Sequence, residues 1–471
     1  MIQNPTHTRA AVELITRRME RIKAPPRAIE TFLRQYHQLV QGHTGLLTRD
    51  QIEPVAEVPD SAGLENHREA GARALAKTLM IKLNGGLGTS MGLDKVKSLL
   101  PVKDGRTFLD IVIGQVAYIR RNAGCPLPLV LMNSFYTHED TLKALLKYPQ
   151  LEAGQRGIPS VFIQHQVPKI RQDNFMPVEW PQDRSREWCP PGHGDLYLAL
   201  CTSGTLTRLL DRGYEYAFVS NTDNLGATLN LPILGFFAEQ KLPFLMEVTD
   251  RTEADKKGGH IARSRDGRLL LREIAQCPAE EEQEFQDIAK YKYFNTNNLW
   301  LNLRALKEKM ENCGHVLDLP LIVNRKSVDA RDAGAPAVYQ LETAMGSALS
   351  IFAGAQAVRV PRVRFAPVKT TEDLLALWSD AYVLTEEMNM VPHADRNNNP
   401  TVIHLDPAFF GAYGDFKARF AGGAPSLRDC NSLTVEGDFR FGRGVTIRGK
   451  VHLRNTSPKQ ELVEDGAKIR G

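Results

Sequence analysis

The first forty residues carry apolar side chains at the spacing of an amphipathic helix. Between about residues 8 and 41 these positions repeat every three or four residues, and Pro25 and Pro26 interrupt the run. The pattern predicts two consecutive helices, so residues 1–45 are expected to form an N-terminal helical segment. The apolar positions are Ala11, Leu14, Ile15, Met19 and Ile22 in the first helix, and Ile29, Phe32, Leu33 and Tyr36 in the second.

The middle of the chain alternates short apolar runs with helical patterns. The runs typical of strands lie at 79–83, 129–132, 161–164, 217–220 and 244–248, with helical patterns between several of them, for example at 107–122 and 137–148. Strands separated by helices indicate an α/β fold with a mixed, mostly parallel sheet that is covered on both faces. Ligands of such sheets bind beyond the carboxyl ends of the strands, so the residues directly after each strand are the candidates for function.

The last part of the chain has a different period. Apolar residues recur every six positions in two series, which are Leu433, Phe439, Val445, Val451 and Val435, Phe441, Ile447, Leu453, with glycines at 437, 442, 444 and 449. A sixfold apolar period with glycine at the corners is typical of a parallel β-helix. Residues 389–471 are therefore expected to form a separate C-terminal domain. An ordinary pair of hairpins with alternating side chains is the alternative.

Composition narrows the class of protein. The 471 residues are 42% hydrophobic and 24% charged, which is typical of a globular chain of two or three structural units. The 59 basic and 55 acidic side chains nearly balance, and no long basic run is interleaved with aromatic residues, so nucleic acid is not an expected partner. The six cysteines form no CxxC pair, and no apolar stretch reaches roughly 18 residues. The first thirty residues lack an apolar core segment, so a secretory signal is not expected. We therefore expect a soluble, cytoplasmic protein with reduced thiols and no membrane contact.

A glycine-rich segment directly after the first predicted strand is the clearest candidate for chemistry. Residues 82–92 read KLNGGLGTSMG, and Lys95 and Lys97 follow. Glycines let a polyanion approach the main chain closely, and consecutive amide N–H groups form a concavity that binds anions. The spacing matches neither GxGxxG nor GxxxxGK[ST], which disfavours the dinucleotide fold and the P-loop kinases. A strand, a glycine loop and then a lysine predict a phosphate-binding site.

This motif resembles the signature of the UTP–glucose-1-phosphate uridylyltransferases, with Val96 in place of the proline that often precedes the lysine. Further blocks occur in the family's order between about residues 78 and 375, namely LMNSF at 131–135, PPGHGD at 190–195, FVSNTDNLG at 218–226, FNTNNLW at 294–300, QLETA at 340–344 and PVKTT at 367–371. The resemblance implies a Rossmann-like nucleotidyltransferase core, with residues 46–388 as the catalytic domain. The resemblance also implies that the C-terminal parallel β-helix is left-handed. Relatives often oligomerise through this domain.

The reaction implied by the resemblance joins UTP and glucose 1-phosphate and releases pyrophosphate. Both reactants are anions, so the protein must neutralise charge and align the attacking and leaving groups, whereas no proton need be removed. Lys97 and Lys369 are the expected catalytic residues, and Asp223 is the expected ligand of Mg²⁺. The nucleotide is expected to bind to Leu83, Asn84, Gly85, Gly86, Gln164, Gly192, Asn221 and Thr222 as well, and the sugar phosphate to His193, Glu273, Asn295, Thr296 and Asn297. Gln166 is the alternative to Gln164 for the uracil contact.

Two other readings stay open on the sequence. A relative that activates galactose 1-phosphate or an N-acetylhexosamine 1-phosphate would carry much the same motifs. A non-catalytic sensor of nucleotide sugars, or an assembly scaffold built on the β-helix, is expected to lack one of the three charged residues Lys97, Asp223 and Lys369. All three are present. The other expected partner is a further copy of the same chain, bound through the C-terminal β-helix in a homo-oligomer.

Overall fold

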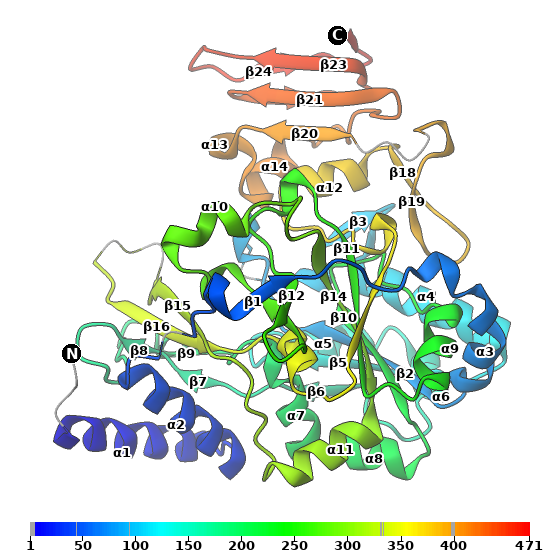
Figure 1. Ribbon diagram of the computed structural model, residues 1–471. Helices are drawn as coiled ribbons and strands as arrows, with labels where there is room; N and C mark the ends of the chain where they lie inside the picture. The colour runs from blue at the N-terminus through cyan, green and yellow to red at the C-terminus, as the bar shows by residue number, and fades with distance from the viewer. Residues whose placement is uncertain (1–4, 44, 94, 330–331, 333, 397–400) are drawn as a thin grey trace.

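The computed structural model describes residues 5–43, 45–93, 95–329, 332, 334–396 and 401–471. Its N-terminal part is a pair of helices, α1 (Pro5–Arg21) and α2 (Pro26–Val40), as the sequence predicts. The apolar positions of the pair pack against Val167, Ile170 and Leu341 of the main body. The two helices therefore form a layer along one side of the molecule rather than a free arm (Figure 1).

A ten-stranded mixed sheet forms the centre of the molecule. Its main path is β1 (Ile52–Pro54), β12 (His260–Ser264), β14 (Tyr293–Asn302), β10 (Tyr216–Asn221), β2 (Thr78–Asn84), β5 (Leu129–Asn133) and β6 (Val161–Ile163), joined by β11 (Phe244–Asp250), β13 (Leu269–Arg272) and β17 (Gln356–Arg359). Strands β2, β5, β6, β10, β11, β12 and β17 run in one direction, whereas β1, β13 and β14 run in the other. The expectation of a mixed, mostly parallel sheet is confirmed.

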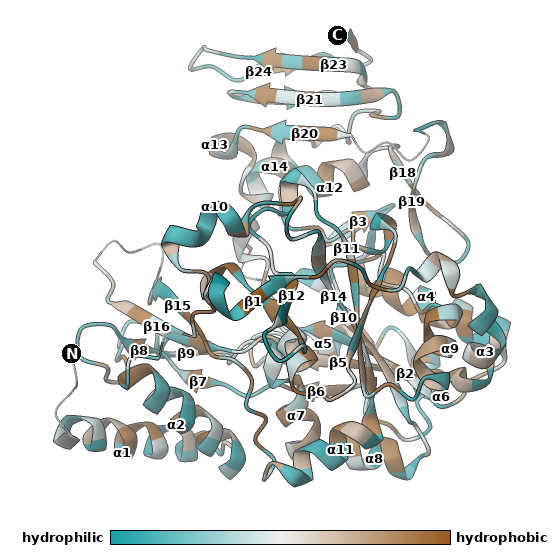
Figure 2. Cartoon of the chain, in the orientation of Figure 1, coloured by the Kyte–Doolittle hydropathy of each residue, from teal (hydrophilic) through white to brown (hydrophobic). Residues whose placement is uncertain are grey.

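Helices cover both faces of this sheet. On β2, Met80 points to one core with α4 (Phe108–Ala123) and α9 (Leu231–Glu239), while Leu79 and Ile81 point to a second core. The second core contains α7 (Leu196–Thr202), α8 (Thr205–Asp211) and α11 (Leu303–Asn312). Side chains alternate across a strand, so a strand covered on both sides reads as a continuous apolar run (Figure 2).

The remaining elements are mostly short. The helices are α3 (Arg68–Leu75), α5 (His138–Leu145), α6 (Pro149–Ala153), α10 (Glu282–Phe285), α12 (Thr371–Trp378), α13 (Pro407–Phe410) and α14 (Tyr413–Arg419). The strands are β3 (Pro101–Lys103), β4 (Arg106–Thr107), β7 (Val167–Pro168), β8 (Ile170–Arg171), β9 (Trp188–Cys189), β15 (Ile322–Ser327), β16 (Ala337–Glu342), β18 (Tyr382–Leu384) and β19 (Met390–Pro392). No helix in the described ranges is long and apolar enough to cross a membrane, and the six cysteines are free thiols.

The C-terminal segment consists of parallel strands stacked on the main body (Figure 1). Strands β20 (Val402–Leu405), β21 (Cys430–Glu436), β23 (Thr446–Arg454) and β25 (Lys468–Arg470) form one sheet, and β22 (Phe439–Phe441) and β24 (Glu461–Val463) form another. Leu433 pairs with Val451, eighteen residues and thus three sixfold periods later. The hairpin alternative is wrong, because every one of these pairs is parallel, whereas hairpin strands pair antiparallel.

Candidate active site

The carboxyl ends of four neighbouring parallel strands meet at one edge of the sheet. Strands β10, β2, β5 and β6 are adjacent in that order. The glycine loop follows β2, Asp223 follows β10, Ser134 follows β5, and Gln164 follows β6. Residues that lie up to 138 positions apart in the chain are therefore brought to one edge, where the sequence placed the ligand site.

Two backbone hydrogen bonds fold the glycine loop back on itself. The Lys97 N–H donates to the Gly86 carbonyl at 3.3 Å, and the Gly88 N–H donates to the Lys95 carbonyl at 3.4 Å. Of the four glycines only Gly92 has a left-handed backbone, with φ of 65°. Gly85 is close to another group, since a β-carbon there would lie 2.5 Å from Nε2 of the buried Gln164 and would displace that side chain. The loop thus brings the Gln164 amide against the main chain.

Lys97 and Asp223 form an ion pair between the loops after β2 and β10. The Lys97 Nζ lies 2.5 Å from Asp223 Oδ2, and the two side chains keep 14% and 21% of their surface exposed. This pair places a cation and a carboxylate together at the edge of the sheet, open to a ligand. A partly exposed carboxylate is an oxygen donor that can hold Mg²⁺ when a ligand supplies further oxygens.

Lys369 is carried to the same place by a segment from the other half of the chain. The Val368 N–H donates to the Asp223 carbonyl at 3.2 Å. The Lys369 N–H donates to Asp373 Oδ2 at 2.7 Å, so the N-terminal turn of α12 fixes its main chain. The Lys369 ammonium also acts on the pKa of Glu273, which places these two predicted residues within electrostatic reach of each other.

Three residues predicted for the nucleotide use their polar groups inside the protein. Asn84 Nδ2 donates to Asn133 Oδ1 at 2.7 Å and to Thr141 Oγ1 at 2.9 Å. The Leu83 carbonyl accepts both the N–H and the hydroxyl of Thr222, at 3.1 and 2.6 Å. These contacts lock the ends of β2, β5 and β10 together. Asn221, the last residue of β10, is partly exposed at the same edge.

His193 is held in one tautomer. Its Nδ1 accepts the Met345 N–H at 2.9 Å, so the neutral ring carries its hydrogen on Nε2, and burial lowers the pKa to about 4. Gly192 has φ of 80°, and a β-carbon there would lie 2.5 Å from the Thr343 carbonyl oxygen. Both glycines beside His193 thus pack closely on residues 342 and 343, where a β-carbon at either position would clash.

The three predicted residues on β14 lie at a bulge. Glu247 of β11 pairs with Asn298 and the next residue, Val248, pairs with Asn295, so two residues of β14 are left unpaired. Asn297 takes a left-handed φ of 57° there, and its N–H donates to Asn295 Oδ1 at 2.9 Å. The Thr296 hydroxyl instead points inward and donates to the Glu247 carbonyl at 2.7 Å. The side-chain amides of Asn295 and Asn297 therefore lie together at the bulge, whereas the Thr296 hydroxyl is turned toward β11.

Glu273 follows β13 and lies against the main chain of Gly259. A β-carbon on that glycine would lie 2.6 Å from the Glu273 carboxyl. Burial raises the pKa of Glu273 to about 7, and the charge of Lys369 opposes this rise. The group therefore changes its charge in the neutral range, which an exposed glutamate does not do.

A comparison with protein families identifies the chain. A model described as UTP–glucose-1-phosphate uridylyltransferase matches residues 29–448. The chain belongs to this family. The uridylyltransferase of Solanum tuberosum is 42% identical over 423 residues, which cover 89% of this chain and 84% of that protein.

Solved structures of the family have the same fold. The crystal structure described as a UDP-glucose phosphorylase from Trypanosoma brucei is 44% identical, with a TM-score of 0.89, and the match covers 98% of this chain and all of that one. A variant of the UDP-glucose pyrophosphorylase from Leishmania major, in complex with UDP-glucose, is 43% identical, with a TM-score of 0.90 and 98% of both chains covered. The similarity therefore spans the N-terminal helices, the sheet and the C-terminal strands.

Several polar residues at the site were not among those predicted from the sequence. Ser134 donates from Oγ to the Gly85 carbonyl at 2.8 Å, and Asn224 accepts the Ala366 N–H at 3.0 Å. Both stand inside motif blocks that resemble the family, so their position was a usable signal. Arg364, whose carbonyl accepts a hydrogen bond from Asn224, stands outside every motif block, and no pattern in the sequence indicates its role.

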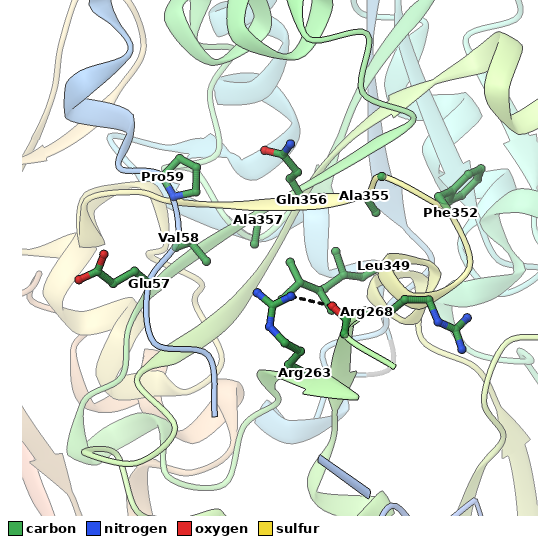
Figure 3. Close-up of a pocket in the computed structure, with 13 residues that line it drawn as sticks. Glu57, Val58, Pro59, Arg263, Arg268, Leu349, Phe352, Ala355, Gln356 and Ala357 are labelled. Atoms are coloured by element: carbon green, nitrogen blue, oxygen red, sulfur yellow. Dashed lines mark hydrogen bonds between the residues drawn. The ribbon is translucent and has the colours of Figure 1, made fainter. Parts of the chain in front are cut away.

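A cavity of about 350 Å³ lies elsewhere in the molecule (Figure 3). Its walls include Val58, Arg263, Leu349, Phe352 and Ala357, from the segment before α3, strand β12, residues 345–355 and strand β17. None of the residues predicted for the uridylyltransferase site lines it. The chemistry is therefore assigned to the strand ends, where the charged groups and the glycine loop converge.

Proposed function

We propose that this chain transfers the uridylyl group of UTP to glucose 1-phosphate, forming UDP-glucose and pyrophosphate. The observation that carries the proposal is the convergence of Lys97, Asp223 and the Lys369 segment at the carboxyl edge of the sheet. Membership of the uridylyltransferase family supports the same reaction, as does the UDP-glucose complex of a relative 43% identical to this chain.

The proposed chemistry is an in-line displacement. A phosphate oxygen of glucose 1-phosphate forms a bond to the α-phosphorus of UTP, and the bond from that phosphorus to the leaving pyrophosphate breaks. Lys97 and Lys369 stabilise negative charge on the phosphates, and the folded glycine loop binds the triphosphate through its amide groups. No general base is needed, because the attacking phosphate is already ionised near pH 7.

Mg²⁺ is part of the proposal, with Asp223 as its protein ligand. Bound there, Mg²⁺ would neutralise phosphate charge and help to orient the triphosphate. The site fits such an ion because Asp223 presents a partly exposed carboxylate at the phosphate cradle. Its pairing with Lys97 means that the lysine must share or release this carboxylate when the metal arrives.

Recognition of the two ends of the product is assigned to opposite sides of the site. Gln164, with the backbone of residues 83–86 and with Gly192, Asn221 and Thr222 nearby, is proposed to hold the uridine. On the other side, Nε2–H of His193 is a fixed donor, and Asn295, Asn297 and Glu273 offer further groups for sugar hydroxyls. Thr296 is proposed to support this side by holding the bulge in place.

The outlying parts of the chain complete the proposal. We propose three parts: a helical segment at residues 1–45, the catalytic domain at 46–388, and a C-terminal left-handed parallel β-helix at 389–471. The eighteen-residue offset between β21 and β23 supports one coil of three sixfold units, whereas the pairs β22–β24 and β23–β25 are offset by 22 residues. We also propose that this domain contributes to a homo-oligomer, which size-exclusion chromatography with light scattering on a chain ending after Pro425 would test.

The deciding experiment measures pyrophosphate release with Mg²⁺, UTP and a panel of sugar 1-phosphates. Fast turnover with glucose 1-phosphate, and much slower turnover with galactose 1-phosphate and N-acetylglucosamine 1-phosphate, is the expected result. A preference for an N-acetylated sugar would retain the mechanism and overturn the sugar assignment. Binding of UTP without turnover of any sugar would favour the sensor.

A further inference from the structure

A buried ion pair lies beneath the site. Arg364 meets Glu247 through two hydrogen bonds, from Nε to Oε2 at 2.9 Å and from Nη2 to Oε1 at 2.7 Å. Glu247 is fully buried, and its oxygens also accept Trp300 Nε1 and Asn298 Nδ2, each at 3.0 Å. The carboxylate thus has four donors, and its orientation in the sheet is fixed.

This pair is connected to both sides of the proposed catalytic centre. The Arg364 carbonyl accepts Nδ2 of Asn224 at 3.1 Å, and Arg364 Nη2 donates to the Thr228 carbonyl at 2.8 Å. Asn224 in turn accepts the Ala366 N–H at 3.0 Å through Oδ1. Asn224 directly follows Asp223, and Ala366 stands three residues before Lys369. One set of contacts therefore joins the loop of the metal ligand to the segment of the second lysine.

Stability alone does not account for such a pair. Burying two charges is costly, and well-packed apolar replacements of a buried ion pair are often neutral or stabilising. A rigid, bidentate arginine does supply a fixed geometry, because its planar fork allows little rotation against a held carboxylate. For an in-line displacement, small errors of position are expensive, since a misplacement of about 1 Å can cost about a hundredfold in rate.

We propose that Glu247, Arg364 and Asn224 form a positioning clamp that sets Lys369 relative to Asp223 for the transfer step. This inference rests on the proposed function, since it assigns the clamp to the same site. None of the three needs to touch the substrate; they act through the main chain of residues 223–228 and 364–369. The clamp therefore affects the rate of the bound complex more than its formation.

The test replaces both charges together. The double variant Glu247→Met with Arg364→Met removes the pair without leaving one charge buried and alone. We expect kcat to fall about 30- to 100-fold while the KM for UTP stays within about threefold. Arg364→Lys keeps the charge beside Glu247 but loses the planar two-bond contact and the bond to Thr228, so its kcat should stay about tenfold or more below that of the wild type. Asn224→Leu, which leaves the ion pair intact and cuts its link to the loop, should reproduce the loss.

Arg396→Met provides a matched control. Arg396 has the same 7% exposure as Arg364 and donates to the carbonyls of Leu427 and Cys430 in the C-terminal part. The variant Arg396→Met should lower the thermal midpoint of unfolding and leave kcat per folded molecule unchanged. Thermal midpoints and calorimetric UTP affinities are measured for every variant.

Two results would overturn the clamp. One is an unchanged kcat in the double variant, and the other is a loss of kcat that merely follows the folded fraction, as in Arg396→Met. If the wild-type protein binds UTP but turns over no sugar 1-phosphate, that result would instead contradict the proposed function, and with it the clamp. The wild-type assay is therefore done first, so that the two failures are told apart.

Discussion

The two halves of the site are built in different ways. The half proposed to bind the nucleotide stands on the parallel strands β2, β5, β6 and β10, whose carboxyl ends lie side by side. The half proposed to bind the sugar stands on the antiparallel strands β12, β13 and β14 and on the segment before α12. In the first half the candidates carried by these four strands lie in their last residues or just beyond them. In the second half a bulge, a turn and a buried ion pair place the candidates.

This difference determines how much a single side chain matters. In the nucleotide half, polar groups such as Thr222 and Asn84 fasten neighbouring strand ends, and the loop offers main-chain amides. In the sugar half, side chains such as Asn297 and His193 are the proposed contacts, each held by one or two hydrogen bonds. Charge on the phosphates should therefore dominate the largest mutational effects, and sugar contacts the smaller ones.

The largest effect is expected for Lys97→Ala. Removing the cation that pairs with Asp223 should lower kcat/KM about a thousandfold, or about 4 kcal/mol of transition-state stabilisation. Initial rates of pyrophosphate release measure this. Lys95→Ala is the matched control, because Lys95 is exposed on the same loop, and a change of less than about threefold is expected. Equal losses in both variants would assign the role to the loop's charge as a whole.

The next effect is expected for Asp223→Asn, which keeps the shape and removes the charge. We expect kcat to fall about a hundredfold and the Mg²⁺ concentration for half-maximal rate to rise, because a neutral amide is a weaker ligand for a hard cation. Magnesium titrations at fixed UTP measure this. Asp250→Asn, at a surface ion pair with Arg359, should leave the titration unchanged. An unaltered magnesium requirement in Asp223→Asn would remove this residue from the metal site.

The third prediction separates neighbours on the bulge. Asn297→Gly, which suits the left-handed backbone, should raise the KM for glucose 1-phosphate about tenfold through loss of the amide. Thr296→Ala should leave that KM within about twofold and lower the free energy of unfolding by about 1–2 kcal/mol, since its hydroxyl bonds the Glu247 carbonyl. Steady-state kinetics and urea unfolding measure the two quantities. A large rise of KM in Thr296→Ala would place its hydroxyl on the sugar.

The smallest effect is a pH dependence from Glu273. With a pKa near 7, its carboxylate fraction rises between pH 6 and 8, so the KM for glucose 1-phosphate should fall severalfold over that range. Glu273→Gln should abolish this part of the change, and the variant also corrects for ionisation of the substrate itself. His193 contributes nothing here, because its pKa of about 4 keeps it neutral throughout.

The same carboxyl gives a linked change in stability. Because its pKa is raised on folding, the folded protein binds this proton more tightly than the unfolded chain does. The contribution of Glu273 is therefore most favourable at low pH and is lost as pH rises through about 7. Chemical unfolding at pH 5.5 and 8 should show a smaller pH difference in Glu273→Gln than in the wild type. Parallel curves for the two proteins would contradict the raised pKa.

The amino-acid sequence by itself determined the parallel core and one half of the site. The strands at 79–83, 129–132 and 217–220 were predicted because a strand covered on both faces is apolar at almost every position, with Lys82 and Ser220 as the buried polar exceptions. The glycine loop and Asp223 then followed, since both stand directly after such strands. The sixfold period similarly indicated parallel strands in the tail, and these are observed.

Tertiary structure alone decided the other half. Strand β14 has polar residues in its middle and pairs with β10, β11 and β12, so no local pattern marks its bulge or the direction of its side chains. The glycines on either side of His193 pack against Thr343, 150 positions after that histidine. Arg364 and Glu247 meet across 117 positions. Such contacts depend on how distant segments pack, and hydrophobic periodicity carries no information on that pairing.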